Sequence, residues 1–434
     1  MKDKKSIIIL YSKGLYDTNA LDLADELKKV GSDCHVLAIA DDKYTNFGRS
    51  RVMRGCYKFS IRNCRWMYSC YSNMTAKKKA ASKVLKNIKA DPTERTGVGK
   101  FAYDLTCRYY KVKNILRRYE PDIVLCFTPN VLKSAIKANE QLRMYTTKIY
   151  ACLTDFALDM RFFNRRTAGY LVQNIDIKKR LVGEGIDENK IFVTSILADK
   201  VEYLDKASIK SEIGIMNDKP CVLLVGGRYG ASAVKSAFST LINYTEHFNI
   251  IMLSGGSKTI VNMARSIAQS VSDSVFVINS VDNIAKLYNV ADIVVATPTS
   301  CICSEVLAYG KTLILLKGAG QMENANQQYL LSHNYALDGT KKEKLIVTLS
   351  DVILNGAKLN IGQYVNGGDI KNVAQHLLNK ADEVFEEKKI LIAEQELKDA
   401  EDIDDYVIEE VDNNMIEAPD DGVIIDEYND LEEN

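Results

Sequence analysis

Two glycine-rich segments in the second half of the chain are candidates for binding an anion. Gly226–Gly230 (GGRYG) follows the apolar run Val222–Val225, and Ser254–Gly256 (SGG) follows the next apolar run. Because glycine has no side chain, backbone N–H groups at such turns can approach a phosphate closely, and the dipole of a following helix favours negative charge. A tight strand–helix connection also requires glycine, so neither turn is decisive alone. Their repetition favours a diphosphate site.

A glutamate further along the chain is a candidate for binding a sugar hydroxyl. Glu305 lies in a helical pattern that we expect over residues 304–309. A carboxylate at a helix start accepts hydrogen bonds from hydroxyl groups and is favoured by the helix dipole. An acid at this position also stabilises a helix without binding any ligand, so the residues alone leave both readings open.

Two aspartates in the first half are candidates for a general base. Asp17 lies shortly after the apolar run Ser6–Tyr11, and Asp155 lies directly after Lys148–Leu153. A carboxylate whose pKa is raised by its surroundings can take a proton from a hydroxyl group. Each aspartate is also a suitable helix cap or hydrogen-bonding residue, and the sequence does not choose between these roles. We expect His35 and His333 to be structural.

Short apolar runs alternate with helical patterns along both halves of the chain. The runs are Ser6–Tyr11, Cys34–Ile39, Pro121–Phe127, Lys148–Leu153, Gly169–Gln173, Val222–Val225, Ile250–Leu253, Val275–Asn279, Ile293–Ala296 and Thr312–Leu316. Continuous apolar runs of this length are typical of parallel strands buried on both faces. The two successive alternations predict an α/β protein with two doubly wound, Rossmann-like domains that face a cleft.

The domain boundaries follow from changes in composition. We expect a first domain over residues 1–198, with a basic insertion at 43–118, and a second domain over residues 199–380. Residues 199–218 are polar and are expected to link the two. Residues 381–434 form an acidic tail that is poor in aromatic residues, and we expect it to be disordered from Asp399 onward.

The formal net charge of zero is the sum of two oppositely charged segments. Residues 43–118 hold 20 Lys and Arg against 3 acids, together with aromatics such as Trp66 and Tyr68. Basic and aromatic residues in one segment favour contact with an anionic membrane surface. Nucleic acid would attract the same charges, but no nucleic-acid-binding motif accompanies them. An ordinary solvated insertion is the third reading.

The tail after Ala381 holds 22 acids. It is expected to keep the protein soluble, to bind a partner protein, or to mask the basic insertion within the chain. The near-equal and opposite charge of the two segments motivates the masking hypothesis.

The cysteines and histidines do not have the spacing of a metal site. The chain holds 10 Cys and 4 His, and the pair Cys301 and Cys303 has no second pair at zinc spacing. We therefore expect reduced thiols and no metal. The sequence begins MKDKK without a signal-peptide pattern and has no run of eighteen apolar residues, so we expect a cytoplasmic protein without a membrane-spanning helix.

The order of these segments resembles glycosyltransferase family twenty-eight, in particular the monogalactosyldiacylglycerol synthases and the processive diacylglycerol glucosyltransferases. The resemblance covers most of residues 5–340 and implies the GT-B fold. It implies that residues 1–198 are the acceptor-binding domain and residues 199–380 the nucleotide-sugar-binding domain. It implies that the glycine turn at 226–230 contacts a nucleotide diphosphate, that Val281–Ile284 lies beside the base and that Glu305 holds the ribose. Gln321 and Asn324 would lie near the donor sugar. The expected donor-site residues are Gly226, Gly227, Arg228, Gly255, Asn283, Ile284, Ser300, Glu305, Gln321 and Asn324.

The resemblance also implies a function, with departures that put its activity in question. It implies transfer of a hexose from a UDP-sugar to a membrane lipid such as diacylglycerol, at the inner face of the cell membrane and without another cofactor. Family members carry histidines after the first strand and after the segment matching Thr154–Phe156, and neither is present here. Thr299-Ser300 replaces a Gly-Gly pair. The alternative is therefore a catalytically degraded homologue that binds a nucleotide-sugar or the membrane as a sensor or scaffold.

Overall fold

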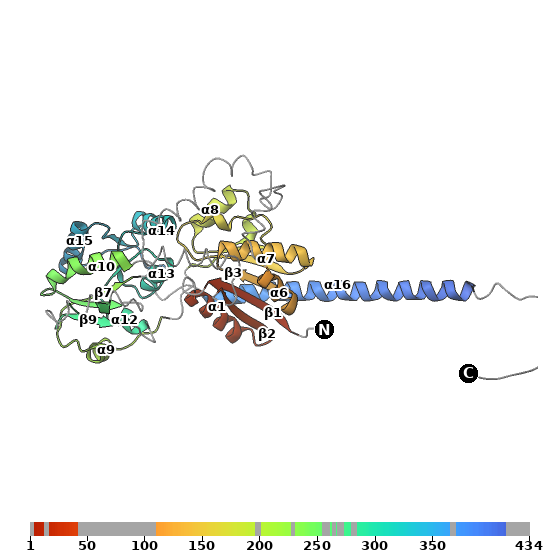
Figure 1. Cartoon of the computed structure of the whole chain (residues 1–434), viewed down its shortest axis with the longest axis horizontal. Helices are drawn as coiled ribbons and strands as arrows, with labels where there is room; N and C mark the ends of the chain where they lie inside the picture. Colours follow the sequence, from red (N-terminus) through yellow and green to blue (C-terminus); the bar gives the residue numbers. More distant parts are fainter. Residues whose placement is uncertain are drawn as a thin grey trace, which may run out of the picture. The chain divides into compact units, whose positions relative to one another are not determined.

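Two six-stranded parallel sheets organise the described part of the chain. The computed structural model describes residues 4–12, 17–41, 110–195, 201–226, 231–253, 261–262, 266, 273–278, 284–364 and 370–413. The first sheet and its helices are called the first lobe, and the second sheet and its helices are called the second lobe. Figure 1 shows both sheets with helices around them. The predicted α/β class with two doubly wound domains is confirmed.

The first sheet has the order β2-β1-β3-β4-β5-β6. Its strands are β1 (Lys5–Ser12), β2 (Cys34–Asp41), β3 (Ile123–Cys126), β4 (Lys148–Leu153), β5 (Gly169–Val172) and β6 (Ile191–Val193). Side chains of β1 alternate between the two faces, so Ile7 and Ile9 enter one core and Ile8 and Leu10 enter the other. Burial on both faces explains why the strand is continuously apolar in sequence.

Helices cover both faces of the first sheet. They are α1 (Asp17–Val30), α6 (Tyr110–Tyr119), α7 (Pro129–Leu142) and α8 (Ile175–Gly183), with short 3-10 turns at Met160–Phe162 and Glu188–Lys190. α1 packs on the face that carries Ile7 and Ile9 through Leu23 and Leu27. α7 packs on the opposite face, as Figure 1 also shows.

The second sheet has the order β12-β11-β10-β7-β8-β9. Its strands are β7 (Cys221–Val225), β8 (Asn249–Leu253), β9 (Val275–Ile278), β10 (Ile293–Ala296), β11 (Thr312–Leu315) and β12 (Leu337–Asp338). Its helices are α9 (Lys206–Ile213), α10 (Ala231–Leu241), α12 (Ala285–Val290), α13 (Ser300–Ala308), α14 (Gln321–Ser332) and α15 (Lys342–Asn355), and a 3-10 turn covers Ile242–Tyr244.

The segment expected to be a polar linker contains a helix. α9 begins after Asp205, whose side chain accepts a hydrogen bond from the Ser208 N–H, and it ends at Gly214 with a φ of 88°. Ile209 of α9 is 4% exposed and belongs to the core of the second lobe. Residues 205–214 are therefore part of that lobe, because both ends of the helix are capped and Ile209 and Ile213 pack on its core.

The last helix returns the chain to the first lobe. α16 spans Ile370–Asn413, and Val373, Ala374, Leu377, Leu378 and Ala381 are buried with the side chains of α1 and β1. Its aromatic contact is His376 on Phe192 of β6, with ring centroids 4.2 Å apart. The first lobe is thus built from both ends of the described chain.

The acidic segment differs from the expectation at its start. We expected disorder from Asp399, but α16 continues to Asn413. The apolar residues Ile403, Val407 and Val411 recur every four positions, which is a helical spacing that the acidic composition obscured. Residues 385–434 form a unit separate from residues 1–384, and positions 414–434 lie outside the described residues.

Candidate functional site

Strand order places two predicted binding segments next to each other. In the second sheet, β7 lies between β8 and β10, so the order in which successive strands are added reverses between β7 and β10. Ligands of open α/β sheets bind at the carboxyl ends of strands where the order reverses. Gly226 directly follows β7, and α13 begins four residues after β10. These two segments, which are distant in sequence, therefore share the switch point of the second sheet.

The loop after β4 contacts the second lobe through backbone groups. Ser300, the first residue of α13, donates its hydroxyl hydrogen to the carbonyl oxygen of Thr154. Gln173 lies directly after β5. Its side-chain amide has one orientation in which both the oxygen and the nitrogen are hydrogen-bonded. In that orientation its Oε1 accepts from Ser304 Oγ over 3.0 Å and its Nε2 donates to the Asp155 carbonyl over 3.1 Å. The carboxyl edges of the two sheets thus meet at residues 154–155.

Asp155 is the ionisable group at this meeting point. Asn326 of α14 donates from Nδ2 to Asp155 Oδ1 over 2.8 Å. Among the described residues, Asp155 Oδ2 has no hydrogen bond. Burial raises the pKa of Asp155 from 3.8 to about 6, helped by the charges of Asp159 and Glu323 and opposed by Asn326 and Arg161. One carboxylate oxygen is hydrogen-bonded to Asn326, the other has no partner among the described residues, and the pKa is about 6.

A buried hydroxyl lies one residue away from Asp155. The Thr154 side chain is 7% exposed, and its Oγ1 has no hydrogen-bond partner within the chain. Leaving such a group unpaired costs about 1–3 kcal/mol. Such a group is an exception in native structures, where most buried polar atoms have a hydrogen-bond partner.

Glu305 lies in α13, but not where the sequence suggested. The helix begins at Ser300, so Glu305 is in its second turn and gains little from the helix dipole, which acts on the first turn. Tyr288 of α12 donates its hydroxyl hydrogen to Glu305 Oε2 over 2.6 Å, and Cys301 Sγ lies 3.3 Å from Oε1. Burial raises the pKa of Glu305, and these two hydrogen bonds oppose the shift. α13 begins four residues earlier than the sequence analysis predicted, and the residue before it, Thr299, makes no side-chain cap hydrogen bond.

Gln321 and Asn324 lie in the first turn of α14 and are both exposed. The loop before α14 is packed tightly against this turn, because a Cβ on Gly318 would lie 2.6 Å from Asn324 Oδ1 and 3.0 Å from the Asn324 backbone nitrogen. Gly318 N–H also donates to Gln327 Oε1 over 3.1 Å. The two polar side chains are therefore presented on a rigid helix start.

The remaining predicted site residues are only partly described. Ile284 lies directly before α12 and packs against the core of the second lobe. The first residue of α1 is Asp17, whose side chain is outside the described part. Gly227, Arg228, Gly255 and Asn283, and residues 42–109 of the basic insertion, lie outside the described residues.

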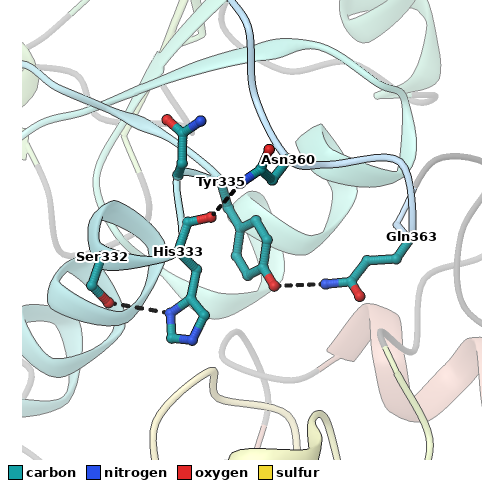
Figure 2. A pocket seen from close by; sticks show the side chains of 6 residues that line it. Ser332, His333, Tyr335, Asn360 and Gln363 are labelled. Atoms are coloured by element: carbon teal, nitrogen blue, oxygen red, sulfur yellow. Dashed lines mark hydrogen bonds between the residues drawn. The ribbon is translucent and has the colours of Figure 1, made fainter.

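A polar pocket lies beside the C-terminal end of α14. Its volume is about 510 Å³, and it is lined by Ser332, His333, Asn334, Tyr335, Asn360 and Gln363. Figure 2 shows these side chains, with Gln363 donating to the Tyr335 hydroxyl over 2.7 Å. His333 lies between Tyr329 and Tyr335 and contacts Asp176 of α8, with Nε2 3.3 Å from Oδ2. His333 therefore packs against two tyrosine rings and lies beside a carboxylate, while it also lines the pocket.

Sequence reasoning missed the residues that join the two lobes. Asn326, Gln173 and Ser304 contact partners that are more than 100 positions away in sequence. The sequence analysis instead predicted Asn324, two positions earlier, because Gln321 and Asn324 resemble a motif of the family. No local pattern distinguishes an exposed Asn324 from a buried Asn326, except that the latter falls on the same face as Glu323 and Leu330.

The described residues contain neither a metal-binding cluster nor a membrane-spanning helix. No group of three or more His, Cys, Asp or Glu has metal-binding geometry in the part of the chain that the structure describes. None of the described helices is long and apolar enough to cross a membrane. The six described cysteines, Cys34, Cys126, Cys152, Cys221, Cys301 and Cys303, are free thiols.

Comparisons with known proteins agree with this architecture. Residues 18–197 match the family model described as monogalactosyldiacylglycerol (MGDG) synthase. A processive diacylglycerol beta-glucosyltransferase of Bacillus mycoides is 24% identical over 222 residues, which are 50% of this chain and 56% of that protein. The chain therefore spans about half the length of this relative.

Two further proteins extend the comparison. The UDP-N-acetylglucosamine–N-acetylmuramyl-(pentapeptide) pyrophosphoryl-undecaprenol N-acetylglucosamine transferase of Listeria monocytogenes is 24% identical over 58% of this chain and 70% of its own. A solved structure titled as a putative UDP-N-acetylglucosamine 2-epimerase from Listeria monocytogenes has a TM-score of 0.56 at 13% identity, covering 88% of this chain and 97% of its own. Over residues 18–197 the chain is thus similar to the monogalactosyldiacylglycerol synthases, it also resembles the processive diacylglycerol glucosyltransferases, and its two sheets have the arrangement of the GT-B fold.

Proposed function

We propose that this protein transfers a hexose from a UDP-sugar to a membrane lipid such as diacylglycerol. The observation that carries the proposal is Asp155, which lies where the carboxyl edges of both sheets meet, with one oxygen held by Asn326 and a pKa of about 6. A base at this position would face donor and acceptor substrates held by different lobes. The names of the relatives support a sugar donor and a lipid acceptor.

The proposed reaction is a displacement at the anomeric carbon of the donor sugar. Asp155 Oδ2 accepts the proton of the acceptor hydroxyl, whose oxygen forms a bond to the anomeric carbon. The bond between that carbon and the β-phosphate oxygen breaks, and UDP leaves with the electron pair. Backbone N–H groups of the glycine turns and the N-termini of α13 and α14 stabilise the developing charge on the diphosphate. Asp17 is the second candidate for the base.

The donor is proposed to bind on the second lobe. Glu305 accepts hydrogen bonds from the ribose hydroxyls, while Asn283 and Ile284 lie beside the base. Gly226, Gly227, Arg228, Gly255 and Ser300 surround the diphosphate, and Gln321 and Asn324 contact the sugar. Tyr288 supports this arrangement because it fixes the Glu305 side chain before any ligand binds.

The acceptor is proposed to reach the first lobe from an anionic membrane surface. Lys111, Arg117 and Arg118 are exposed on α6, the helix that continues the basic insertion. Each cation near an anionic membrane contributes about 1 kcal/mol to binding. We propose that residues 43–118 bind the inner face of the cell membrane, so that the protein works there as a peripheral enzyme.

The proposal is tested by separating binding from turnover. Calorimetric titration with UDP and several UDP-sugars measures donor binding, and release of UDP is then measured with and without diacylglycerol vesicles. We expect donor binding and vesicle-dependent UDP release that Asp155→Asn lowers by at least a hundredfold. Absence of nucleotide binding would contradict the proposal.

A second candidate function is a sensor or scaffold that binds a UDP-sugar without turnover. The Ser300 hydroxyl favours it, because it is hydrogen-bonded to Thr154 where family members carry glycine. Its side chain fills space that a diphosphate would otherwise approach. Binding without UDP release in the same assay would favour the sensor, and restoration of turnover by Ser300→Gly would identify this residue as the cause.

A further inference from the structure

We infer that Asn326 is a positioning residue that couples docking of the second lobe to the orientation of Asp155. Its amide makes two hydrogen bonds to the loop after β4. Nδ2 donates to Asp155 Oδ1 over 2.8 Å, and Oδ1 accepts the Ala157 N–H over 3.1 Å. A backbone N–H only donates and a carboxylate only accepts, so this amide orientation is the one that satisfies both partners. Asn326 therefore holds both the Asp155 carboxylate and the backbone of the loop that carries Asp155.

The two residues belong to different lobes. Asp155 follows β4 of the first sheet, whereas Asn326 is in α14, which follows β11 of the second sheet. The Asn326 side chain is 1% exposed. α14 carries further contacts to the first lobe, since Tyr329 stacks on Phe156 at 6.2 Å and donates to Asp176 over 3.3 Å. Separation of the lobes would break all of these contacts, so Asp155 is oriented by Asn326 only in the docked state.

The hydrogen bond also affects the charge of Asp155. Burial and the acidic side chains of Asp159 and Glu323 raise the pKa of Asp155, while Arg161 and Asn326 lower it. Asn326 is the larger of the two lowering influences. The hydrogen bond from Asn326 therefore orients the carboxylate and, against the effect of burial, favours its ionised form, which is the form that can accept a proton. The catalytic consequence rests on the proposed function, whereas the control of Asp155 by Asn326 does not.

Two substitutions of Asn326 separate positioning from general stability. Asn326→Ala removes both hydrogen bonds. Asn326→Asp keeps the shape and the acceptor for Ala157 N–H but places a second carboxylate against Asp155. Gln328→Ala, at an exposed position of the same helix, is the matched control. All variants are prepared as the full chain, and thermal unfolding confirms that each is folded.

The main measurement is the pH profile of kcat/KM for UDP release. We expect the acid limb to move to higher pH by about one pH unit in Asn326→Ala and further in Asn326→Asp, because like charges disfavour ionisation. At pH 6.5, kcat should fall at least tenfold in Asn326→Ala, with the donor KM changed less than twofold. Gln328→Ala should match the wild type. An unmoved acid limb in both Asn326 variants would overturn the inference.

A second measurement is independent of turnover. Carboxyl-¹³C-labelled aspartate reports the titration of Asp155 by NMR, and Asp155→Asn identifies its signal. We expect the signal to titrate at higher pH in both Asn326 variants than in the wild type. If the wild type releases no UDP but Asp155 titrates at higher pH in both Asn326 variants, the proposed function fails and the positioning role stands. If turnover is normal but Asp155 titrates at the same pH in the variants and the wild type, only the positioning role fails.

Discussion

The hydroxyl of Tyr288 donates to Glu305 Oε2 over 2.6 Å and ties α12 to α13. With Cys301 on the other oxygen, each Glu305 oxygen accepts one protein hydrogen bond. A carboxylate oxygen has two lone pairs, so each can accept one more from a ligand. The contact therefore orients Glu305 for hydroxyl groups without saturating it.

Glu305→Gln is predicted to weaken UDP binding by roughly 1–3 kcal/mol, because hydrogen bonds to a charged acceptor are replaced by weaker ones. Tyr288→Phe should weaken binding by a smaller amount, since it removes only the group that orients the carboxylate. Calorimetry with UDP and with uracil measures both variants. Equal affinity for UDP in wild type and Glu305→Gln would place the ribose elsewhere.

Thr154→Val is predicted to leave folding stability unchanged or to increase it, since it replaces a buried hydroxyl without a partner by a methyl group of similar size. If a substrate hydroxyl pairs with Thr154 Oγ1, the same variant should raise the KM for one substrate by about tenfold. Denaturant unfolding and steady-state kinetics check the two parts. A stability loss above about 1 kcal/mol would show that the hydroxyl has a partner within the protein.

The raised pKa of Asp155 predicts a specific dependence of stability on pH. The folded protein holds this proton more tightly than the unfolded chain, so folding stability falls as pH rises from about 4 to about 6. The difference in the Asp155 pKa between the folded and unfolded states corresponds to a loss of folding stability on the order of 2–3 kcal/mol. Asp155→Asn keeps the hydrogen bond to Asn326 and should lack this component. The difference between the two unfolding free energies, measured from pH 4 to pH 7, should therefore grow with pH.

The return of α16 to the first lobe predicts a coupled pair of substitutions. A Cβ on Gly31 would lie 2.5 Å from Leu378 Cδ2, so Gly31→Ala should cost about 1–3 kcal/mol. Leu378→Ala should cost about 2–5 kcal/mol through the cavity that it leaves. The double variant should cost clearly less than the two together, because the smaller residue at 378 makes room for the methyl group. Additive losses in denaturant unfolding would contradict this packing.

Deleting residues 399–434 tests whether the acidic tail masks the basic segment. If it does, the truncated protein should bind anionic vesicles more strongly at low salt, and the difference should shrink at high salt as charges are screened. Vesicle sedimentation at two salt concentrations measures this. Vesicle binding that is unchanged by the deletion at low salt would rule masking out. Neutral vesicles are the control.

The sequence determined the strands and the α/β class of this protein. Continuous apolar runs such as Ser6–Tyr11 and Val222–Val225, short and followed by glycine-containing turns, favour strands buried on both faces, and they correspond to β1 and β7. Glycine turns after strands also indicated which edges would hold ligands. Such signals are local, because they depend on residues within one element and its turn.

Only the tertiary structure decided what meets at the junction of the two lobes. Strand order brought Gly226 beside the start of α13, and docking of the lobes set Asn326 against Asp155 and Ser300 against Thr154. The sequence drew attention to Asp155 but left its role open between a base and a cap. Its partner and its raised pKa arise from burial between elements more than 100 residues apart, and no local pattern encodes contacts at that separation.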